Sequence, residues 1–187
     1  MAAGLGSRKG SHGLSCARCF NLKAKSFCFS VDNFGVCAFP TGRFGDRTTF
    51  SSTCSNGSTL NRLDVVYSLP RFDKRCMKLD AGDATTFRLM NAASISLGRL
   101  VSDLRSVGHL TLQSMFVRDV EGIVDNTTPR AVNAWLDAVE RVQPESVDLY
   151  SLARPPARGT LLRVAPSILE GIAARVTARG IPARVCA

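Results

Sequence analysis

The sequence predicts an α/β protein built around a parallel sheet. From about residue 47 onward, stretches typical of strands alternate with stretches typical of helices. The predicted strands end near residues 54, 80, 117, 153 and 186, so that successive ends lie roughly 26 to 37 residues apart, about the size of one βα unit. Repeated βα units imply a parallel sheet, in a doubly wound or a barrel arrangement.

The length limits how much of a barrel can form. A complete eight-unit (β/α) barrel takes about 250 residues, whereas residues 46–187 provide about 140. We therefore expect a partial TIM-type barrel, or a small open sheet, with parallel strands and outer helices. Its edge strands would need to be covered or paired, so self-association through open sheet edges is expected.

The first predicted strand spans residues 47–54 and is rich in Thr and Phe, and a turn follows at 55–58. The apolar residues after this turn recur at helical spacing and predict one helical face: Leu60, Leu63, Val66 and Tyr67. Residues 75–80 form the next predicted strand. A helical zone follows from about 84 to 107, with a break near 91–93, and Asp83 is expected to cap its first helix.

Residues 110–117 are the third predicted strand. The helix after it begins with Thr128 as N-cap and Pro129 at its first position, and it stops before Pro144. The residues expected on its inward face are Val132, Trp135, Leu136, Val139 and Val142.

A strand at residues 146–153 and a helix from Pro166 to near Gly180 complete the pattern, and residues 183–186 can form a short final strand. The residues expected on the inward face of this last helix are Ile168, Leu169, Ile172, Ala173 and Val176.

Composition divides the chain into two parts. The protein has 187 residues, 45% hydrophobic and 21% charged, with a net charge of +9. Residues 1–45 hold six basic side chains against one acidic, and they show no steady periodicity. We expect them to form a basic, cysteine-containing, poorly ordered segment ahead of the domain at 46–187.

Composition also indicates the cellular compartment in which the protein is expected. No apolar run approaches the roughly 20 residues of a membrane helix, so no membrane segment is expected. The seven cysteines are odd in number, and no secretory signal precedes them, which argues against a disulfide scaffold and favours a reducing cytoplasm.

Five short pieces after residue 55 occur in the order found in radical S-adenosylmethionine (SAM) proteins. They are Asn-Gly-Ser at 56–58, Leu-Asp-Ala at 79–81, Thr-Phe-Arg-Leu-Met-Asn at 86–91, residues 113–117 and residues 150–156. About 130 residues resemble the C-terminal part of such a barrel. The branch that they resemble is the Fe–S oxidoreductases similar to the tRNA wybutosine-synthesis enzyme.

The resemblance implies SAM and a [4Fe–4S] cluster as cofactors, with a small-molecule or tRNA substrate that the sequence does not identify. The family holds its cluster with three cysteines spaced C-x3-C-x2-C, and the sequence has no such motif. Cys16 and Cys19 are spaced C-x2-C, and Cys28 follows them, which is a poor match to a cluster or zinc site. The chain is therefore expected to be a truncated or inactive version of the family.

Four residues are cofactor-binding candidates through the resemblance. Asn56 lies in the family-like turn, and Asp80 follows a strand, where its carboxylate can accept from a ribose hydroxyl, cap the next helix or pair with Lys78. Gln113 shares a strand face with Met115, and its amide suits either a nucleoside or a satisfied buried position.

Arg154 is the fourth candidate, and it precedes two prolines. Its guanidinium suits a carboxylate or phosphate, or an internal ion pair with a neighbour on its strand face. The loop between the third predicted strand and the Trp135 helix contains Asn126, which is expected to shape the turn into that helix.

Two other functions compete with the radical SAM interpretation. The basic segment at 1–45 can contact RNA or another polyanion, although it lacks dense Lys/Arg clusters with interleaved aromatic residues. A (β/α) enzyme of different chemistry would use Asp80, Gln113 and Arg154, but the sequence offers no matched acid–base pair.

Overall fold

The computed structural model describes residues 27–31, 34–40, 49–91, 95–153 and 159–186. Within them a seven-stranded sheet has the order β1-β2-β3-β4-β5-β7-β9. Its strands are β1 Phe27–Val31, β2 Phe34–Pro40, β3 Thr49–Ser55, β4 Lys74–Lys78, β5 Thr111–Met115, β7 Ser146–Tyr150 and β9 Ala183–Cys186. The helices are α1 Leu63–Ser68, α2 Ala84–Met90, α3 Leu97–Val107, α4 Pro129–Val142 and α5 Pro166–Thr177, with a 3-10 turn at Leu69–Arg71.

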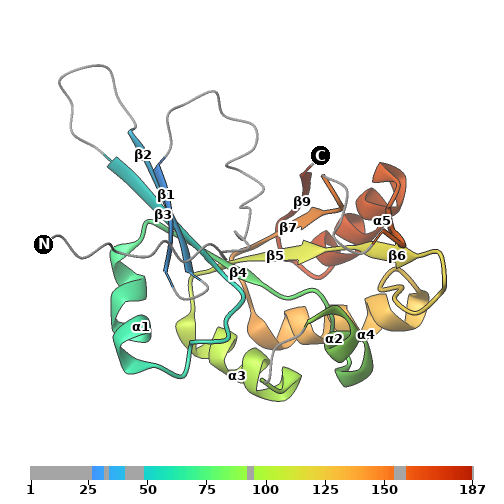
Figure 1. The fold of residues 1–187 in the computed structure, drawn as a ribbon, viewed down its shortest axis with the longest axis horizontal. Helices are drawn as coiled ribbons and strands as arrows, with labels where there is room; N and C mark the ends of the chain where they lie inside the picture. The colour runs from blue at the N-terminus through green and yellow to red at the C-terminus, as the bar shows by residue number, and fades with distance from the viewer. Residues whose placement is uncertain (1–26, 32–33, 41–48, 92–94, 154–158, 187) are drawn as a thin grey trace, which may run out of the picture.

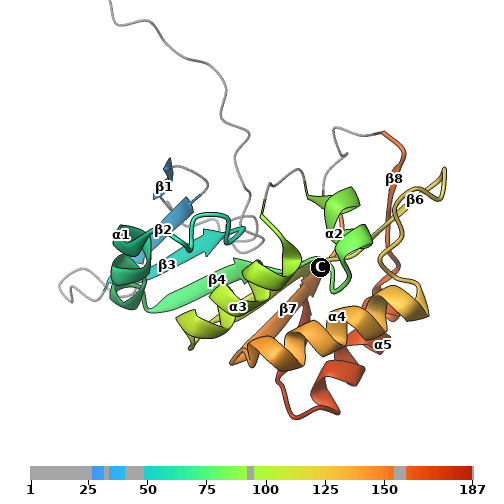
Figure 2. The same cartoon turned by 90° about the horizontal axis from the view of Figure 1, so that it is seen from below.

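Five of these strands confirm the predicted parallel sheet. β3, β4, β5, β7 and β9 pair in parallel and lie in the order in which they occur along the chain. Parallel strands joined by right-handed crossovers place every helix on the same face unless the strand order reverses. It does not reverse, and α1, α3 and α4 lie together below the sheet (Figures 1 and 2). The arrangement is an α/β fold around a parallel sheet of five strands.

The N-terminal edge of the sheet is antiparallel. β1 pairs with β2, and β2 pairs with β3 over seven residue positions from Phe34 opposite Ser55 to Pro40 opposite Thr49. These two strands lie within the segment for which the sequence shows no periodicity. The rest of that segment, residues 1–26, 32–33 and 41–45, lies outside the described residues, so the predicted domain boundary near residue 46 stays a prediction.

The helix starts follow the predicted capping chemistry. The Asp83 side chain accepts hydrogen bonds from the backbone N–H groups of Thr85 and Thr86 at the start of α2. The Thr128 hydroxyl accepts from the backbone N–H of Ala131, and Pro129 occupies the first position of α4. Each cap satisfies an N–H that the helix itself cannot pair.

The hydrophobic core lies between the sheet and its helices. Met77, Leu79, Leu112, Val147 and Leu149 enter it from the strands, and all are at most 1% exposed. The residues predicted for the inward face of α4 are all buried, and in α5 Leu169, Ile172, Ala173 and Val176 are buried as well. The Trp135 ring meets Phe116 edge to face, with ring centroids 5.1 Å apart.

The predicted helical face near residue 60 does not form as expected. Leu60 is buried, but it lies in the turn before α1. Leu63 and Tyr67 lie on α1 and are 71% and 76% exposed, and α1 has no buried residue. The helical spacing was correct from Leu63 onward, but spacing alone does not show which face of a short helix meets the core.

The carboxyl end of the third predicted strand, residues 110–117, differs from the expectation. β5 ends at Met115, and β6, Val117–Asp119, begins immediately after Phe116. β6 pairs antiparallel with β8, Leu161–Arg163, in a separate two-stranded sheet. This ribbon extends beyond the ends of the parallel strands (Figure 2). Residues 110–117 were predicted as one strand because the apolar pattern does not change at Phe116, where the chain leaves the main sheet and begins to pair with β8.

Candidate functional site

The face of the sheet opposite the helices is lined with polar side chains. Successive strand residues point to opposite faces, so the neighbours of the core residues lie on this second face. We call it the polar face, and its residues in β3, β4, β5 and β7, with the residue after β4, include Cys54, Lys78, Asp80, Gln113, Asp148 and Tyr150. Asp80, Gln113 and Asp148 are at most 6% exposed.

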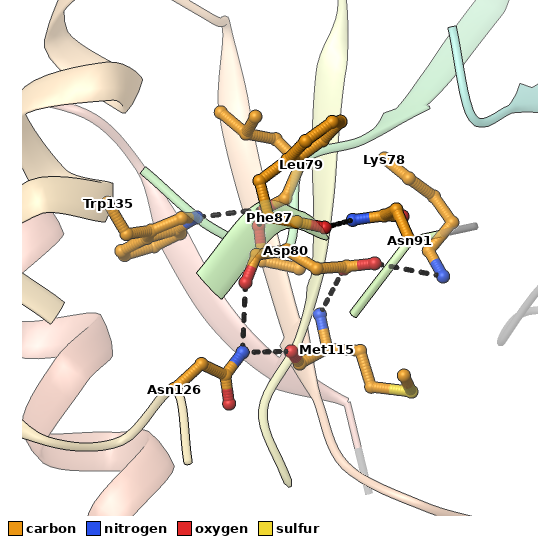
Figure 3. Close-up of polar contacts among 9 residues, drawn as sticks. Lys78, Leu79, Asp80, Phe87, Asn91, Met115, Asn126 and Trp135 are labelled. Atoms are coloured by element: carbon orange, nitrogen blue, oxygen red, sulfur yellow. Dashed lines mark hydrogen bonds and ion pairs between the residues drawn. The ribbon is translucent and has the colours of Figure 1, made fainter. Parts of the chain in front are cut away.

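Lys78 and Asp80 form an ion pair at the carboxyl end of β4. The ammonium nitrogen of Lys78 lies 3.1 Å from Oδ2 of Asp80. Oδ1 of Asp80 accepts a 2.8 Å hydrogen bond from the backbone N–H of Met115 (Figure 3). Both carboxylate oxygens therefore have partners inside the protein, and of the roles open to Asp80 the structure shows the pairing with Lys78.

Asn126 holds the ends of β4 and β5 together. Its side-chain NH2 donates to the backbone carbonyls of Asp80 and Met115 (Figure 3). Its Oδ1 accepts from the backbone N–H of Val117. Asn126 is 2% exposed. Asn126 does more than shape a turn, because its hydrogen bonds hold the chain after β4, which carries Asp80, next to the carboxyl end of β5.

Trp135 supports the same place from α4. Its indole N–H donates a 2.9 Å hydrogen bond to the carbonyl of Leu79, as Figure 3 shows. The hydroxyl of Ser114 also donates to this carbonyl. The prediction that Trp135 is a core residue is confirmed, and its polar atom is satisfied by the strand that carries Lys78 and Asp80.

Tyr150 completes the group from β7. It stands opposite Met115 in the parallel register, and its phenol is close enough to Lys78 and Asp80 for their charges to act on it. Burial and the nearby Asp80 carboxylate raise the pKa of Tyr150 to about 12. The same carboxylate raises the pKa of Lys78 above its ordinary value. At neutral pH the site therefore holds an ammonium group beside a protonated phenol.

A second ionic group lies on the polar face around Asp148. Arg184 of β9 donates two hydrogen bonds to its carboxylate, at 2.6 and 2.8 Å, and Lys74 of β4 lies 3.8 Å from it. The hydrogen bonds to Asp148 raise the pKa of Arg184. Two cations thus share one carboxylate, which leaves this group with one positive charge.

The residues predicted as cofactor contacts lie at different places. Gln113 stands between Lys78 and Asp148 in the strand register, so it is at the centre of the polar face. Asn56 follows β3, and its side chain accepts from the backbone N–H of Ser58 and forms the turn. Arg154 lies outside the described residues, as do Cys16 and Cys19, and nothing is described of the Cys28 side chain.

Lys78 and Tyr150 were not selected from the sequence as site residues. Lys78 entered only as an ion-pair partner, and Tyr150 only as part of a strand. Strand parity is the signal that could have found them, because Lys78 and Asp80 are two residues apart, as are Asp148 and Tyr150. An alternating charged pattern in neighbouring parallel strands indicates a polar face.

The described residues do not fit an iron–sulfur cluster. The described cysteine side chains, Cys54, Cys76 and Cys186, come from three different strands. Among the residues that the structure describes, no three His, Cys, Asp or Glu side chains group so that they could hold a metal ion. No helix in this same part of the chain has the length and apolar character to cross a membrane.

Solved structures share this arrangement. A radical SAM methyltransferase from Sphaerobacter thermophilus superposes with a TM-score of 0.52 at 17% identity, over 72% of this chain and 39% of that one. A domain of the pyruvate-formate lyase-activating enzyme from Bacteroides vulgatus superposes with a TM-score of 0.53 at 13% identity, over 71% of this chain and 79% of that domain. The fold of this chain is therefore similar to that of the radical SAM barrel.

The likeness is one of structure. No protein-family model matches the sequence, and no curated protein matches it. The chain spans 39% of the length of the methyltransferase. At identities of 17% and 13%, the superpositions support the predicted fold class, and activity is a separate question.

Proposed function

We propose that the chain is a radical SAM-type protein whose polar face binds SAM, and that this polypeptide does not generate the radical by itself. The observation that carries the proposal is the unbroken order of five parallel strands with polar side chains at their carboxyl ends. Ligands of parallel α/β folds bind at this edge of the sheet.

The residues that would hold SAM come from the candidates already described. Gln113 supplies a donor and an acceptor at the centre of the polar face, and Asn56 and Arg154 are proposed to border it. When the complete family machinery is present, the cluster supplies the electron that cleaves SAM. The absence of C-x3-C-x2-C from the sequence is the reason to propose that this chain lacks that step.

The proposal also names a branch of the radical SAM proteins. The Leu-Asp-Ala segment at 79–81 lies at the end of β4, and the Thr-Phe segment at 86–87 lies in α2. These positions agree with the order of elements in the branch similar to the tRNA wybutosine-synthesis enzyme. We propose that the chain is a truncated or inactive version of that branch and acts in the cytoplasm.

Anaerobic reconstitution with ferrous iron and sulfide tests the missing step. We expect fewer than the about four irons per chain of a [4Fe–4S] protein, no brown chromophore, and no 5′-deoxyadenosine after addition of dithionite and SAM. A brown protein that forms 5′-deoxyadenosine would show that the chain holds the cluster with residues that this proposal does not include.

Equilibrium dialysis with labelled SAM tests the binding step. We expect the wild-type chain to bind SAM and Gln113→Leu to bind it about tenfold more weakly, since a buried amide then loses its hydrogen bonds. Asn133→Leu is the matched control, because Asn133 is an exposed amide on α4. Absence of SAM binding by the wild-type chain, or equal loss in both variants, would contradict the proposal.

A further inference from the structure

At the carboxyl end of β4, the side chains offer more hydrogen-bond donors than the neighbouring residues accept. An ammonium group has three N–H bonds. In Lys78, one faces Oδ2 of Asp80, at 3.1 Å. The remaining N–H groups can donate to another acceptor, and the phenol of Tyr150, at the same carboxyl edge of the sheet, can donate its O–H.

The exposure of the side chains shows which of these groups a ligand can reach. The Asp80 side chain is 3% exposed, whereas the Lys78 side chain is 23% exposed. Tyr150 and Met115 are partly exposed, while Gln113, deeper on the polar face, is buried. A ligand that approaches the carboxyl edge therefore meets Lys78 and Tyr150 before it meets Asp80.

The charge on this face favours an anion. Lys78 and Asp80 neutralise each other, but Asp148 is shared by Lys74 and Arg184. Among the described charges of the polar face, three cations stand against two carboxylates. An anionic group placed beside Lys78 and Tyr150 would therefore meet two donors and a net positive surrounding.

We propose that Lys78 and Tyr150 form a binding pair for a carboxylate or phosphate group of the ligand, and that Asp80 is a positioning residue that holds the Lys78 ammonium in place. The inference deepens the proposed function, on which it rests for the choice of face. It assigns Asp80 to the pairing with Lys78 in place of the expected contact with a ribose hydroxyl, because its side chain is 3% exposed and each of its oxygens has a partner in the protein.

Small anions test the binding pair directly. The full chain is labelled with 15N and titrated with inorganic phosphate, with acetate and with neutral acetamide, while backbone amide shifts are followed. We expect saturable shifts of the amides of Met115 and Tyr150 with phosphate or acetate, and none with acetamide. The two anions distinguish a phosphate site from a carboxylate site, since the better ligand saturates at the lower concentration.

Two variants separate binding from folding. Tyr150→Phe keeps the ring and removes the O–H, and we expect it to weaken anion binding about tenfold. Lys78→Met removes the charge and should abolish the shifts, although it leaves Asp80 without its cation. If Lys78→Met does not fold, Tyr150→Phe decides. Arg99→Gln, on the exposed face of α3, is the charge-matched control and should bind as wild type.

The positioning role has its own spectroscopic test. In Asp80→Asn, the pKa of Lys78, followed through the 13C and 1H shifts of its ε-methylene, should fall toward its ordinary value, because Asp80 is the largest cause of the rise. A merely structural role would leave that pKa unchanged in a folded variant, and such a result would overturn the assignment of Asp80.

The outcomes distinguish this inference from the proposed function. Saturable anion shifts without SAM binding would remove the proposed function and keep the Lys78–Tyr150 pair. SAM binding without anion shifts, or anion shifts that Tyr150→Phe leaves unchanged, would overturn the pair and keep the proposed function.

Discussion

The two faces of the same sheet differ in nearly every property. Toward the helices, Leu112 and Val147 are fully buried among apolar side chains. On the polar face, Gln113 and Asp148 are the very next residues along the same strands, and they are also almost fully buried. The contrast is therefore not between buried and exposed residues but between apolar packing and polar networks.

The two faces therefore contribute differently to stability and to ligand binding. Apolar burial contributes about 25 cal/mol per Å² without requiring particular partners. Buried polar groups contribute only when their hydrogen bonds and charges are matched. The helix face can therefore hold the strands in place, and the polar face can present Lys78, Gln113 and Tyr150 in fixed positions.

The largest effect is expected where the loop after β4 meets α4. A Cβ added to Gly82 would lie 2.0 Å from the backbone carbonyl oxygen of Ala134, and backbone atoms cannot move aside easily. Gly82→Ala should lower the free energy of unfolding by about 4 kcal/mol or more. Urea unfolding followed by circular dichroism measures the loss.

Gly171 provides the matched control for this variant. It lies inside α5, and nothing is within 4 Å of an added Cβ. Gly171→Ala should raise the free energy of unfolding by about 0.5–1 kcal/mol through helix propensity. Equal effects of the two substitutions would show that the close approach of Gly82 to α4 is not formed in solution.

A neighbouring pair on β5 tests the comparison of the two faces. Leu112→Ala should lower the free energy of unfolding by about 3 kcal/mol, because it removes methyl groups from the core and leaves a cavity. Gln113→Ala should cost less, about 1 kcal/mol, because it removes no apolar side chain from the core between the sheet and the helices. Denaturant unfolding of both variants measures the two losses in free energy of unfolding. A larger loss in Gln113→Ala than in Leu112→Ala would show that the polar face contributes more to stability than the core.

The last effect concerns the dependence of stability on pH. In the folded protein the pKa of Tyr150 is about 12, against an ordinary value of 10.0. The folded state then holds its proton more strongly, so this contribution is complete below pH 10 and is lost as pH rises toward 12, a loss of about 3 kcal/mol for two pKa units. The raised pKa of Lys78 adds a loss in the same direction.

Absorbance at 295 nm measures the ionisation of Tyr150. The chain has two tyrosines, so Tyr67→Phe leaves Tyr150 as its only phenol. We expect this variant to titrate near pH 12 when folded and near pH 10 in denaturant. A folded transition near pH 10 would mean that Tyr150 is not held against Lys78 and Asp80.

Much of the architecture could be predicted because local signals agree with the fold. The capping residues Asp83 and Thr128 mark helix starts, and the apolar spacing around Trp135 marks the buried face of α4. The strands were predicted to within a few residues, as β7 illustrates, which was expected at 146–153 and spans Ser146–Tyr150. The helix α1 was located correctly, but the direction of its apolar face was not indicated by spacing.

The candidate site could be predicted less well. Asp80 and Gln113 were selected because they stand at strand ends, and both lie on the polar face. The partners of Asp80, which are Met115, Asn126 and Tyr150, are between 35 and 70 residues away along the chain. No pattern within one strand shows which oxygen of Asp80 is already occupied.

Residues a few positions apart along the chain are enough to predict the alternation of strands and helices and the helix caps. The same holds for the strand parity that puts Leu112 and Gln113 on opposite faces of the sheet. Only the tertiary structure decided the strand order, the antiparallel edge formed by β1 and β2, and the grouping of Lys78, Asp80 and Tyr150. These features depend on contacts between segments that are distant along the chain, and their free energy appears only when the sheet is assembled.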